Sequence, residues 1–293
     1  MTARPRGFAP WSPQPKTQAL VADVLDVLDD YADHLPLTLR QVFYRLVGTR
    51  GFPKTEKGYD RLCETANRAR RAGLIPWDAI RDDGVQLVTH GGYDSPDDWL
   101  DMTAANARWY RRSRQAVQPL RVEVWVEAGG MVPQAARVAE DFGVMVMSCG
   151  GFDSVTAKHE AAVRIVDDGR PCIVVHVGDH DPSGVSLATA ATEDVDAFAR
   201  GYGHGGIEVV RAAITPVQAE RHGLPGAPPK KTDKRGAFTG LTYQAEALEP
   251  ADLAGYIRAV IEEYTDLNVH QDVIDAERDE RDQLVARMRE VSL

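Results

Sequence analysis

The chain has 293 residues, 43% of them hydrophobic and 27% charged, and a formal net charge of −10 at pH 7. This composition is typical of a soluble globular protein with room for one large domain or two ordinary ones. No apolar run approaches the roughly 20 residues of a membrane-spanning helix, and residues 1–15 lack the apolar core of a signal peptide. The three scattered cysteines argue against disulfides and structural zinc and predict a cytoplasmic protein.

The negative charge is unevenly distributed along the chain. Residues 1–120 hold 17 lysines and arginines against 15 acidic residues, whereas the remainder holds 17 against 29. Residues 40–81 alone hold 10 basic residues against 4 acidic ones. A basic region ahead of an acidic one indicates a first domain that binds a polyanion, although a solvated helical surface would show the same balance.

The N-terminal region has the pattern of short helices. We expect helices over residues 17–33, 39–49 and 55–72, a helical turn over 76–80 and a strand over 86–89. Three short helices followed by a strand indicate a helix-turn-helix or winged-helix module. A helix over residues 94–116 would join this first domain, residues 1–120, to the rest of the chain.

Strands and helices alternate from residue 121 onward. We expect strands over residues 122–126, 144–147, 172–177 and 207–213, with helices over 132–142, 154–168 and 185–200 between them. Two helices, over 250–264 and 269–290, close the chain, and the last is charged enough to be a docking or dimer-facing helix. The alternation predicts an α/β second domain, residues 121–293, with a mostly parallel sheet covered by helices.

Acidic residues follow two of the predicted strands at the point where each ends. Glu127 follows the strand over 122–126, and Asp179 and Asp181 follow the strand over 172–177. If these strands are neighbours, about 4.8 Å apart, the three carboxylates converge at the edge where open α/β sheets bind ligands. Such hard oxygen ligands suit Mg²⁺ and phosphoryl-transfer chemistry. Alternatively, Asp181 only caps the helix that follows it and Glu127 is a surface acid.

These acids stand in a recognisable pattern. Glu127 together with Asp179-His-Asp-Pro-Ser-Gly184 resembles the Toprim domain shared by topoisomerases, primases and some nucleases. The proline and glycine are closest to the DxDPxG form of the topoisomerase VI A subunit and the meiotic double-strand-break transesterases. In that family a winged-helix domain comes first and carries the catalytic tyrosine in a motif like R-x-[IVL]-[FY]-Y. The stretch Arg40-Gln-Val-Phe-Tyr44 matches this motif in the right order along the chain.

The resemblance spans about residues 38–250 and is closest to small bacterial and phage Toprim proteins. Three further stretches look like theirs: Pro53–Tyr59, Gly73–Ile80 and Lys230–Asp233. The chain departs from the pattern directly after Glu127. Relatives follow this glutamate with lysine and aspartate, whereas Ala128 and Gly129 follow it here, which removes an expected phosphate contact.

Tyr44 lies on a helix with one apolar face. That face consists of Leu39, Val42, Phe43, Leu46 and Val47. At about 100° per residue, Tyr44 points roughly 130° away from the centre of the face, with Arg40 on nearly the same side. Tyr44 therefore need not be a core aromatic. A phenol with a pKa of about 10 is a poor nucleophile near neutral pH, so Arg40 or a metal would have to activate it. Without the resemblance, Tyr44 would be an ordinary half-exposed helix tyrosine.

The resemblance implies a Mg²⁺-dependent enzyme that binds double-stranded DNA as a homodimer and cleaves it by transesterification at Tyr44, assisted by Arg40. Each Tyr44 would face the metal site of the partner subunit, where Glu127, Asp179 and Asp181 would be the ligands. The DNA-binding residues would be Arg45, Arg61, Arg68, Arg70, Arg71, Lys230 and Lys231.

Other functions fit the same residues. The chain shows no ATPase motif, so strand passage would require a separate ATPase subunit. One alternative is a Toprim metal nuclease that hydrolyses DNA with metal-bound water and leaves Tyr44 a bystander. The other is a catalytically inactive module that binds DNA or a partner.

Overall fold

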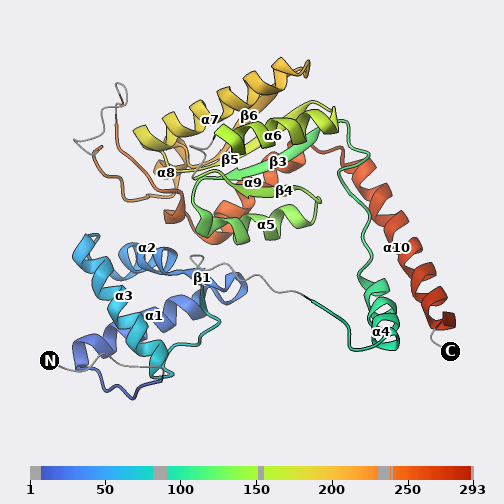
Figure 1. The fold of residues 1–293 in the computed structure, drawn as a ribbon. Coiled ribbons are helices and arrows are strands. Elements are labelled where there is room, and N and C mark those ends of the chain that lie inside the picture. The colour runs from blue at the N-terminus through green and yellow to red at the C-terminus, as the bar shows by residue number, and fades with distance from the viewer. Residues whose placement is uncertain (1–7, 82–90, 151–154, 230–237, 239, 292–293) are drawn as a thin grey trace.

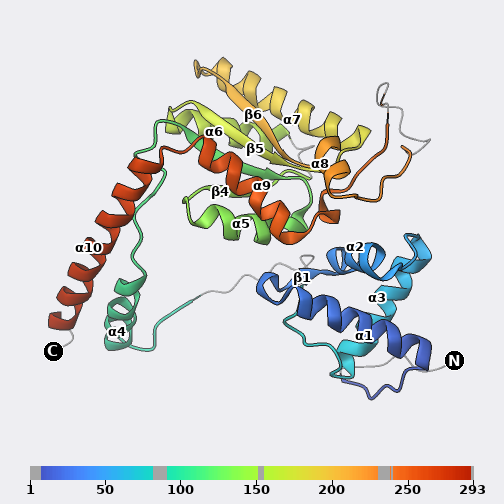
Figure 2. The same ribbon diagram turned by 180° about the vertical axis from the view of Figure 1, so that it is seen from behind.

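The computed structural model describes residues 8–81, 91–150, 155–229, 238 and 240–291. An N-terminal module packs below an α/β domain, and a helical arm projects from the far end of that domain (Figures 1 and 2). The α/β fold class is confirmed. None of the helices in the described part of the chain is long and apolar enough to cross a membrane.

The N-terminal module is a small helical body. Its elements are α1 (Pro15–Asp30), the short 3₁₀ helix η1 (Ala32–His34), β1 (Leu37–Thr38), α2 (Leu39–Arg50), α3 (Glu56–Arg71) and β2 (Ile80–Arg81). The start of α2 is fixed by a capping box, in which Gln41 N donates to Thr38 Oγ1 and Thr38 N donates to Gln41 Oε1. The helix ends at Gly51, whose φ of 64° suits a glycine cap.

The end of this module differs from the prediction. Residues 76–79 form a turn without helix, and Ile80 pairs in parallel with Leu37 as the start of β2. The reason is visible in the hydrogen bonds: Arg70 Nη2 donates to Trp77 O and Ile80 O, so a guanidinium binds carbonyls that helical N–H groups would otherwise take. The strand expected over residues 86–89 lies outside the described residues.

A four-stranded parallel sheet forms the centre of the second domain. Its strands are β3 (Arg121–Val126), β4 (Met145–Ser148), β5 (Cys172–Val177) and β6 (Ile207–Ala213), in the order β4-β3-β5-β6. The covering helices are α5 (Val132–Glu140), α6 (Val155–Asp168), α7 (Pro182–Gly201) and α9 (Pro250–Glu263), with η3 (Gly129–Met131), α8 (Pro216–Arg221) and η4 (Ala245–Ala247) as short elements. One hydrophobic core lies between the sheet and α5 with α9, and another lies under α6 and α7 (Figure 1).

The arm consists of α4 (Pro96–Asn106), the 3₁₀ turn η2 (Ala107–Trp109) and α10 (Leu267–Val291). The helix expected over residues 94–116 is therefore shorter than predicted. Beyond η2 the chain runs along α10, where Arg112 N donates to the buried carboxylate of Glu277 and Arg281 Nε donates to Tyr110 O. Backbone groups that a longer helix would have used internally are thus bound by side chains of α10.

Polar contacts join the N-terminal module to the α/β domain. Arg45 forms an ion pair with Glu249, and Gln41 Nε2 donates to Gln134 Oε1 at 2.8 Å. Lys54 Nζ donates to Pro225 O at 2.9 Å on the opposite side of α2. These contacts hold the amino end of α2 against the carboxyl ends of the central strands.

Candidate functional site

The expected convergence of acids occurs at the carboxyl ends of β3 and β5. The two strands are parallel neighbours, and Val126 lies opposite Val177. Glu127 N then donates to Val177 O at 2.8 Å, and Asp179 N donates to Glu127 Oε2 at 3.0 Å. The last residues of the two strands therefore place Glu127 and Asp179 side by side.

Glycine makes this close approach possible. A Cβ atom at position 178 would lie 2.5 Å from Glu127 Oε2 and 2.7 Å from His176 Cε1. At position 150 a Cβ would lie 1.8 Å from Glu127 O. Gly178 and Gly150 are therefore required where they stand, because any side chain would push the glutamate away from the strand tip.

The electrostatics show carboxylates close together and short of compensating charge. Burial raises the pKa of Glu127, and Asp179 and Asp181 raise it further. Burial likewise raises the pKa of Asp179, with a further rise from Asp181, while a hydrogen bond from Ala245 N and the charges of Arg40 and Arg211 oppose it. Bringing a cation to these acids would relieve both effects.

The donor chemistry of this edge fits Mg²⁺ in part. Carboxylate oxygens are the ligands that this ion takes, and one oxygen of Glu127 and one of Asp179 are already oriented by backbone N–H groups. However, no group of three or more histidine, cysteine, aspartate or glutamate side chains in the described part of the chain is arranged to hold a metal ion. The structure thus brings two of the three expected ligands into contact and leaves Asp181 at the edge of the group.

Tyr44 is buried, although its position on the helix did not require it to be a core aromatic. Only 8% of the residue is exposed, and its ring packs edge-on against Phe43 with centroids 5.4 Å apart. The face of α2 that carries Tyr44 is covered by η4, so α2 is buried on two sides and its apolar face alone did not reveal this. Burial raises the pKa of Tyr44 to about 12; Arg40 lowers it, and Glu246 and Asp179 raise it.

Arg40 lies in a cavity of about 520 Å³ between the two domains. The cavity is lined from the N-terminal module by Thr38, Leu39, Arg40, Tyr59, Cys63, Arg70, Ile80 and Arg81, and from the α/β domain by Ala128, Gly130 and Glu246. Burial acts to lower the pKa of Arg40, but Glu246, Tyr44 and Tyr59 outweigh it and raise the pKa. Since Ala128 directly follows Glu127, the cavity connects Arg40 with the acidic strand tips.

Two of the predicted DNA contacts are structural instead. Arg45 is 6% exposed, pairs with Glu249 and donates to Ala247 O, so its guanidinium joins the domains rather than facing solvent. Burial lowers its pKa to about 10. Arg70 binds the carbonyls of the turn after α3 and lies over the ring of Trp77 at 4.6 Å. Both side chains are already committed to protein groups.

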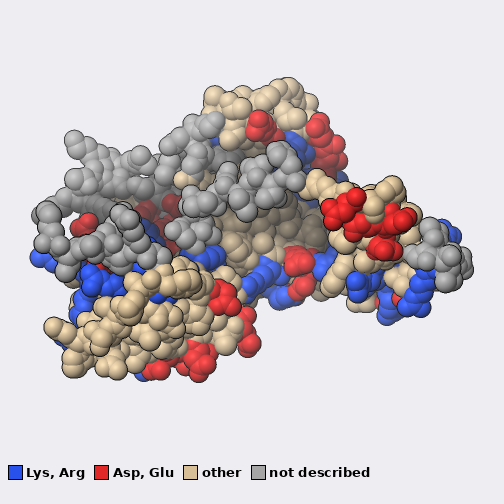
Figure 3. All heavy atoms as spheres, turned by 60° about the horizontal axis from the view of Figure 1, so that its bottom comes forward, with Lys and Arg blue, Asp and Glu red and all other residues tan. Residues whose placement is uncertain are grey.

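The other basic residues remain on the surface of α3. Arg61 and Arg68 are exposed, and Arg71 is partly buried with its Nε donating to Asn67 Oδ1 at 2.8 Å. Basic side chains also gather along the border of the N-terminal module that faces the α/β domain (Figure 3). Lys230 and Lys231 lie outside the described residues.

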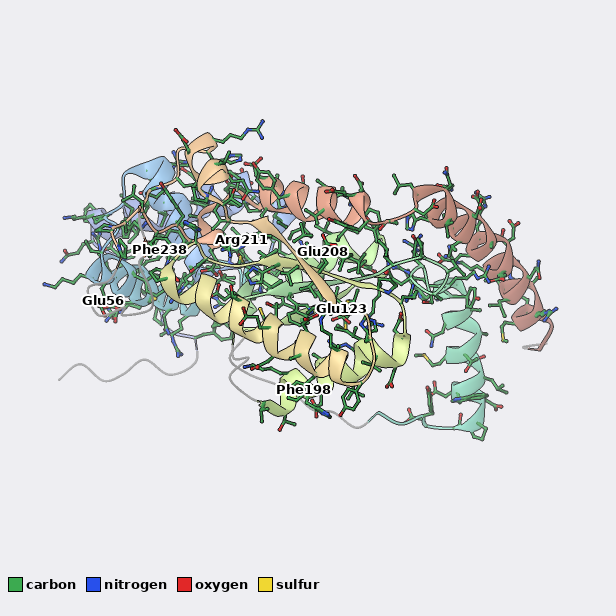
Figure 4. All side chains as sticks on the ribbon, turned by 90° about the horizontal axis from the view of Figure 1, so that it is seen from above. Glu56, Glu123, Phe198, Glu208, Arg211 and Phe238 are labelled. Atoms are coloured by element: carbon green, nitrogen blue, oxygen red, sulfur yellow. The ribbon has the colours of Figure 1, made fainter. Side chains whose placement is uncertain are left out.

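Sequence reasoning missed Arg211 and Glu246. Arg211 belongs to β6 and lies at the end of the sheet near the N-terminal module, whereas Glu123 and Glu208 lie toward the other end (Figure 4). Arg211 is one of two charged residues in β6, with Glu208, so the sequence did not single it out. Glu246 follows a long loop and no pattern marks it. No protein-family model, curated protein or solved structure matches the chain.

Proposed function

We propose that this protein binds double-stranded DNA and cleaves it in a Mg²⁺-dependent reaction at the edge formed by Glu127 and Asp179. One observation carries the proposal: two half-buried carboxylates follow adjacent strand tips, and Ala128, the residue after Glu127, lines the cavity that holds Arg40. A cavity with the guanidinium of Arg40 on one wall and the residue after Glu127 on the other suits a phosphodiester bound beside the acidic strand tips.

The residues take distinct roles in this proposal. Glu127, Asp179 and Asp181 would hold Mg²⁺, which supplies positive charge to the scissile phosphate as negative charge develops on it. Arg40 would bind a non-bridging phosphate oxygen from the opposite wall of the cavity. Arg61, Arg68 and Arg71 on α3 would contact backbone phosphates and make binding salt-dependent without fixing a sequence.

Tyr44 would be the nucleophile. Its phenol oxygen would form a bond to phosphorus while the bond from phosphorus to a deoxyribose oxygen breaks. The phenol gives up its proton, and the departing deoxyribose oxygen takes one up to become a hydroxyl. A pKa of about 12 leaves the phenol protonated at neutral pH. Catalysis therefore requires that DNA or cation binding expose Tyr44 and lower its pKa, and Arg40 already acts in that direction.

The burial of Tyr44 favours a second candidate, a nuclease that uses water in place of the phenol. Its acidic edge would be the same, but Tyr44 would only pack α2 against η4.

A homodimer and a separate ATPase subunit belong to the topoisomerase-like proposal and rest on the resemblance. The charge of Asp179 in the same chain raises the pKa of Tyr44, so the two side chains are close. This closeness supports a site assembled within one chain.

The two candidates separate in a cleavage assay. End-labelled and supercoiled duplex DNA would be incubated with protein and Mg²⁺, stopped with SDS and divided into samples with and without protease. The topoisomerase-like proposal predicts DNA that stays on the protein until proteolysis, is lost in Tyr44→Phe and persists in the control Tyr93→Phe, an exposed tyrosine near α4. Free ends that persist in Tyr44→Phe and vanish in Asp179→Asn would establish the nuclease. Binding with no cleavage by the wild-type protein would contradict both.

A further inference from the structure

Arg211 is bound to the backbone of the acidic strand tip. Its Nη2 atom donates to Gly178 O at 2.8 Å and to Asp179 O at 2.6 Å. Its Nε atom donates to Ile214 O at 3.0 Å. One half-buried guanidinium thus ties together the residues that follow β5 and the residues that follow β6.

The local pairing of the strands explains why such a tie is needed. The register between β5 and β6 shifts between His176 and Val177, because Ala212 of β6 is an extra residue without a partner on β5. Pairing resumes beyond the bulge, since Gly178 N donates to Ala213 O and Ile214 N donates to Gly178 O, both at 2.9 Å. A bulge bends a strand and interrupts its ladder, so the backbone that carries Asp179 depends on extra donors for a fixed position. The planar fork of arginine supplies them in one group.

The hydrogen bonds of Arg211 go to backbone carbonyls and not to the acidic side chains. None of the ion pairs among the described residues involves it, and its donors go to carbonyls. Yet its charge acts on Glu127, Asp179 and Asp181 alike. The turn after β3 has the uncharged residues Ala128, Gly129 and Gly130, so β6 brings a cation to the carboxylates that this turn does not.

We propose that Arg211 is a positioning residue for the metal site, which holds the Gly178–Asp179 backbone so that Asp179 and Glu127 present their oxygens to one divalent cation. The inference rests on the proposed function insofar as that function places Mg²⁺ here. A positioning role and a purely electrostatic role predict opposite changes in metal affinity when Arg211 is substituted. A cation beside a metal site repels the metal, so its removal alone would strengthen binding, whereas loss of positioning weakens it.

The test is Mg²⁺ binding measured by calorimetry on the full chain without DNA. We expect Arg211→Lys and Arg211→Gln each to weaken binding about tenfold, the lower range for residues that orient metal ligands. Arg200→Gln, an exposed arginine paired with Asp196 on α7, is the matched control and should bind as the wild type does. Unchanged binding in Arg211→Lys together with tighter binding in Arg211→Gln would overturn the inference in favour of charge alone.

A second measurement works without metal. Amide hydrogen exchange should be faster in both Arg211 variants at residues 177–180 and 213–215 and unchanged in Arg200→Gln. Wild-type exchange rates at these residues would overturn the positioning role whatever the metal result. Absence of Mg²⁺ binding by the wild-type protein would contradict the proposed function and the metal role of Arg211, and accelerated exchange would then leave a backbone role only.

Discussion

Glu123 and Glu127, toward opposite ends of β3 in the central sheet, have different hydrogen-bond partners and pKa values shifted in opposite directions. Near its amino end, Glu123 is fully buried and accepts hydrogen bonds from Arg121, Arg164 and Trp125; although burial alone would raise its pKa, these partners lower it. At the carboxyl end, Glu127 has no such side-chain cation bound to it among the described residues, and its pKa is raised.

The presence or absence of a bound arginine separates Glu123, which has a structural role, from Glu127, to which we propose that a cation binds. Glu123 and Glu127 are four residues apart, but Glu123 lies within β3 and Glu127 directly follows it. A buried carboxylate matched by arginines is satisfied by the fold itself, whereas a pair of carboxylates that repel each other costs folding free energy and becomes favourable once a cation binds.

The largest effect should appear in catalysis. Asp179→Asn keeps an oxygen for the hydrogen bond from Ala245 N but removes the charge that would hold Mg²⁺. We expect DNA cleavage to fall by roughly 10³-fold, as when a main stabilising group of a transition state is lost. Cleavage rates on linear duplex DNA measure this, with Asp194→Asn, an exposed partner of Lys158, as control. Equal rates in the wild type and in Asp179→Asn would place the chemistry elsewhere.

The next effect concerns folding at the satisfied end. Glu123→Gln leaves Arg121 and Arg164 without their buried anion and should lower the free energy of unfolding by roughly 3 kcal/mol. Urea denaturation gives the value. Glu208→Gln, an exposed glutamate on β6 of the same sheet, should change it by less than about 0.5 kcal/mol. A loss no larger than that of Glu208→Gln would mean that Glu123 is not the structural acid described above.

The opposite sign is expected at the carboxyl end. Without metal, Glu127→Gln removes a charge that burial and Asp179 disfavour, so we expect the free energy of unfolding to rise. Added Mg²⁺ should stabilise the wild type and leave this variant unchanged. Thermal melts with and without MgCl₂ give both results, and destabilisation of the metal-free variant would end the contrast between the two ends.

The smallest effect is the change with pH in what buried and half-buried carboxylates contribute to the free energy of unfolding. Hydrogen bonds from Arg170 lower the pKa of Asp168 to about 2, although burial acts to raise it. The ionised Asp168 therefore stabilises the fold above pH 4, and this stabilisation is lost as the pH falls toward 2. The raised pKa values of Glu127 and Asp179 act in reverse, because their cost is present at neutral pH and is relieved as the pH falls through those values. Metal-free Glu127→Gln should therefore lose its advantage over the wild type on acidification. A difference that stays constant with pH would contradict this.

Strand ends were the predictable part of this molecule. The strand pattern marked β3 and β5, and the structure supplied the missing fact that they are parallel neighbours, which brings Glu127 and Asp179 together. Helix faces were harder, because periodicity gives one apolar face and cannot show a second element packed on the other. Tyr44 and Arg45 are buried by η4 and Glu249, which lie about 200 residues away in the chain. The hydrogen bonds of Arg211 could not be predicted, since they lie beside a register shift that only the paired strands reveal.

The most direct test of the central claim is to identify the residue that carries DNA after cleavage. Protein reacted with duplex DNA and Mg²⁺ would be denatured, treated with nuclease to leave a short nucleotide remnant, digested with trypsin and analysed by mass spectrometry. The account predicts the peptide Gln41-Val-Phe-Tyr-Arg45 with a nucleotide on Tyr44, and no such peptide from Asp179→Asn. Cleaved DNA with an unmodified peptide, or with the nucleotide on another residue, would contradict it.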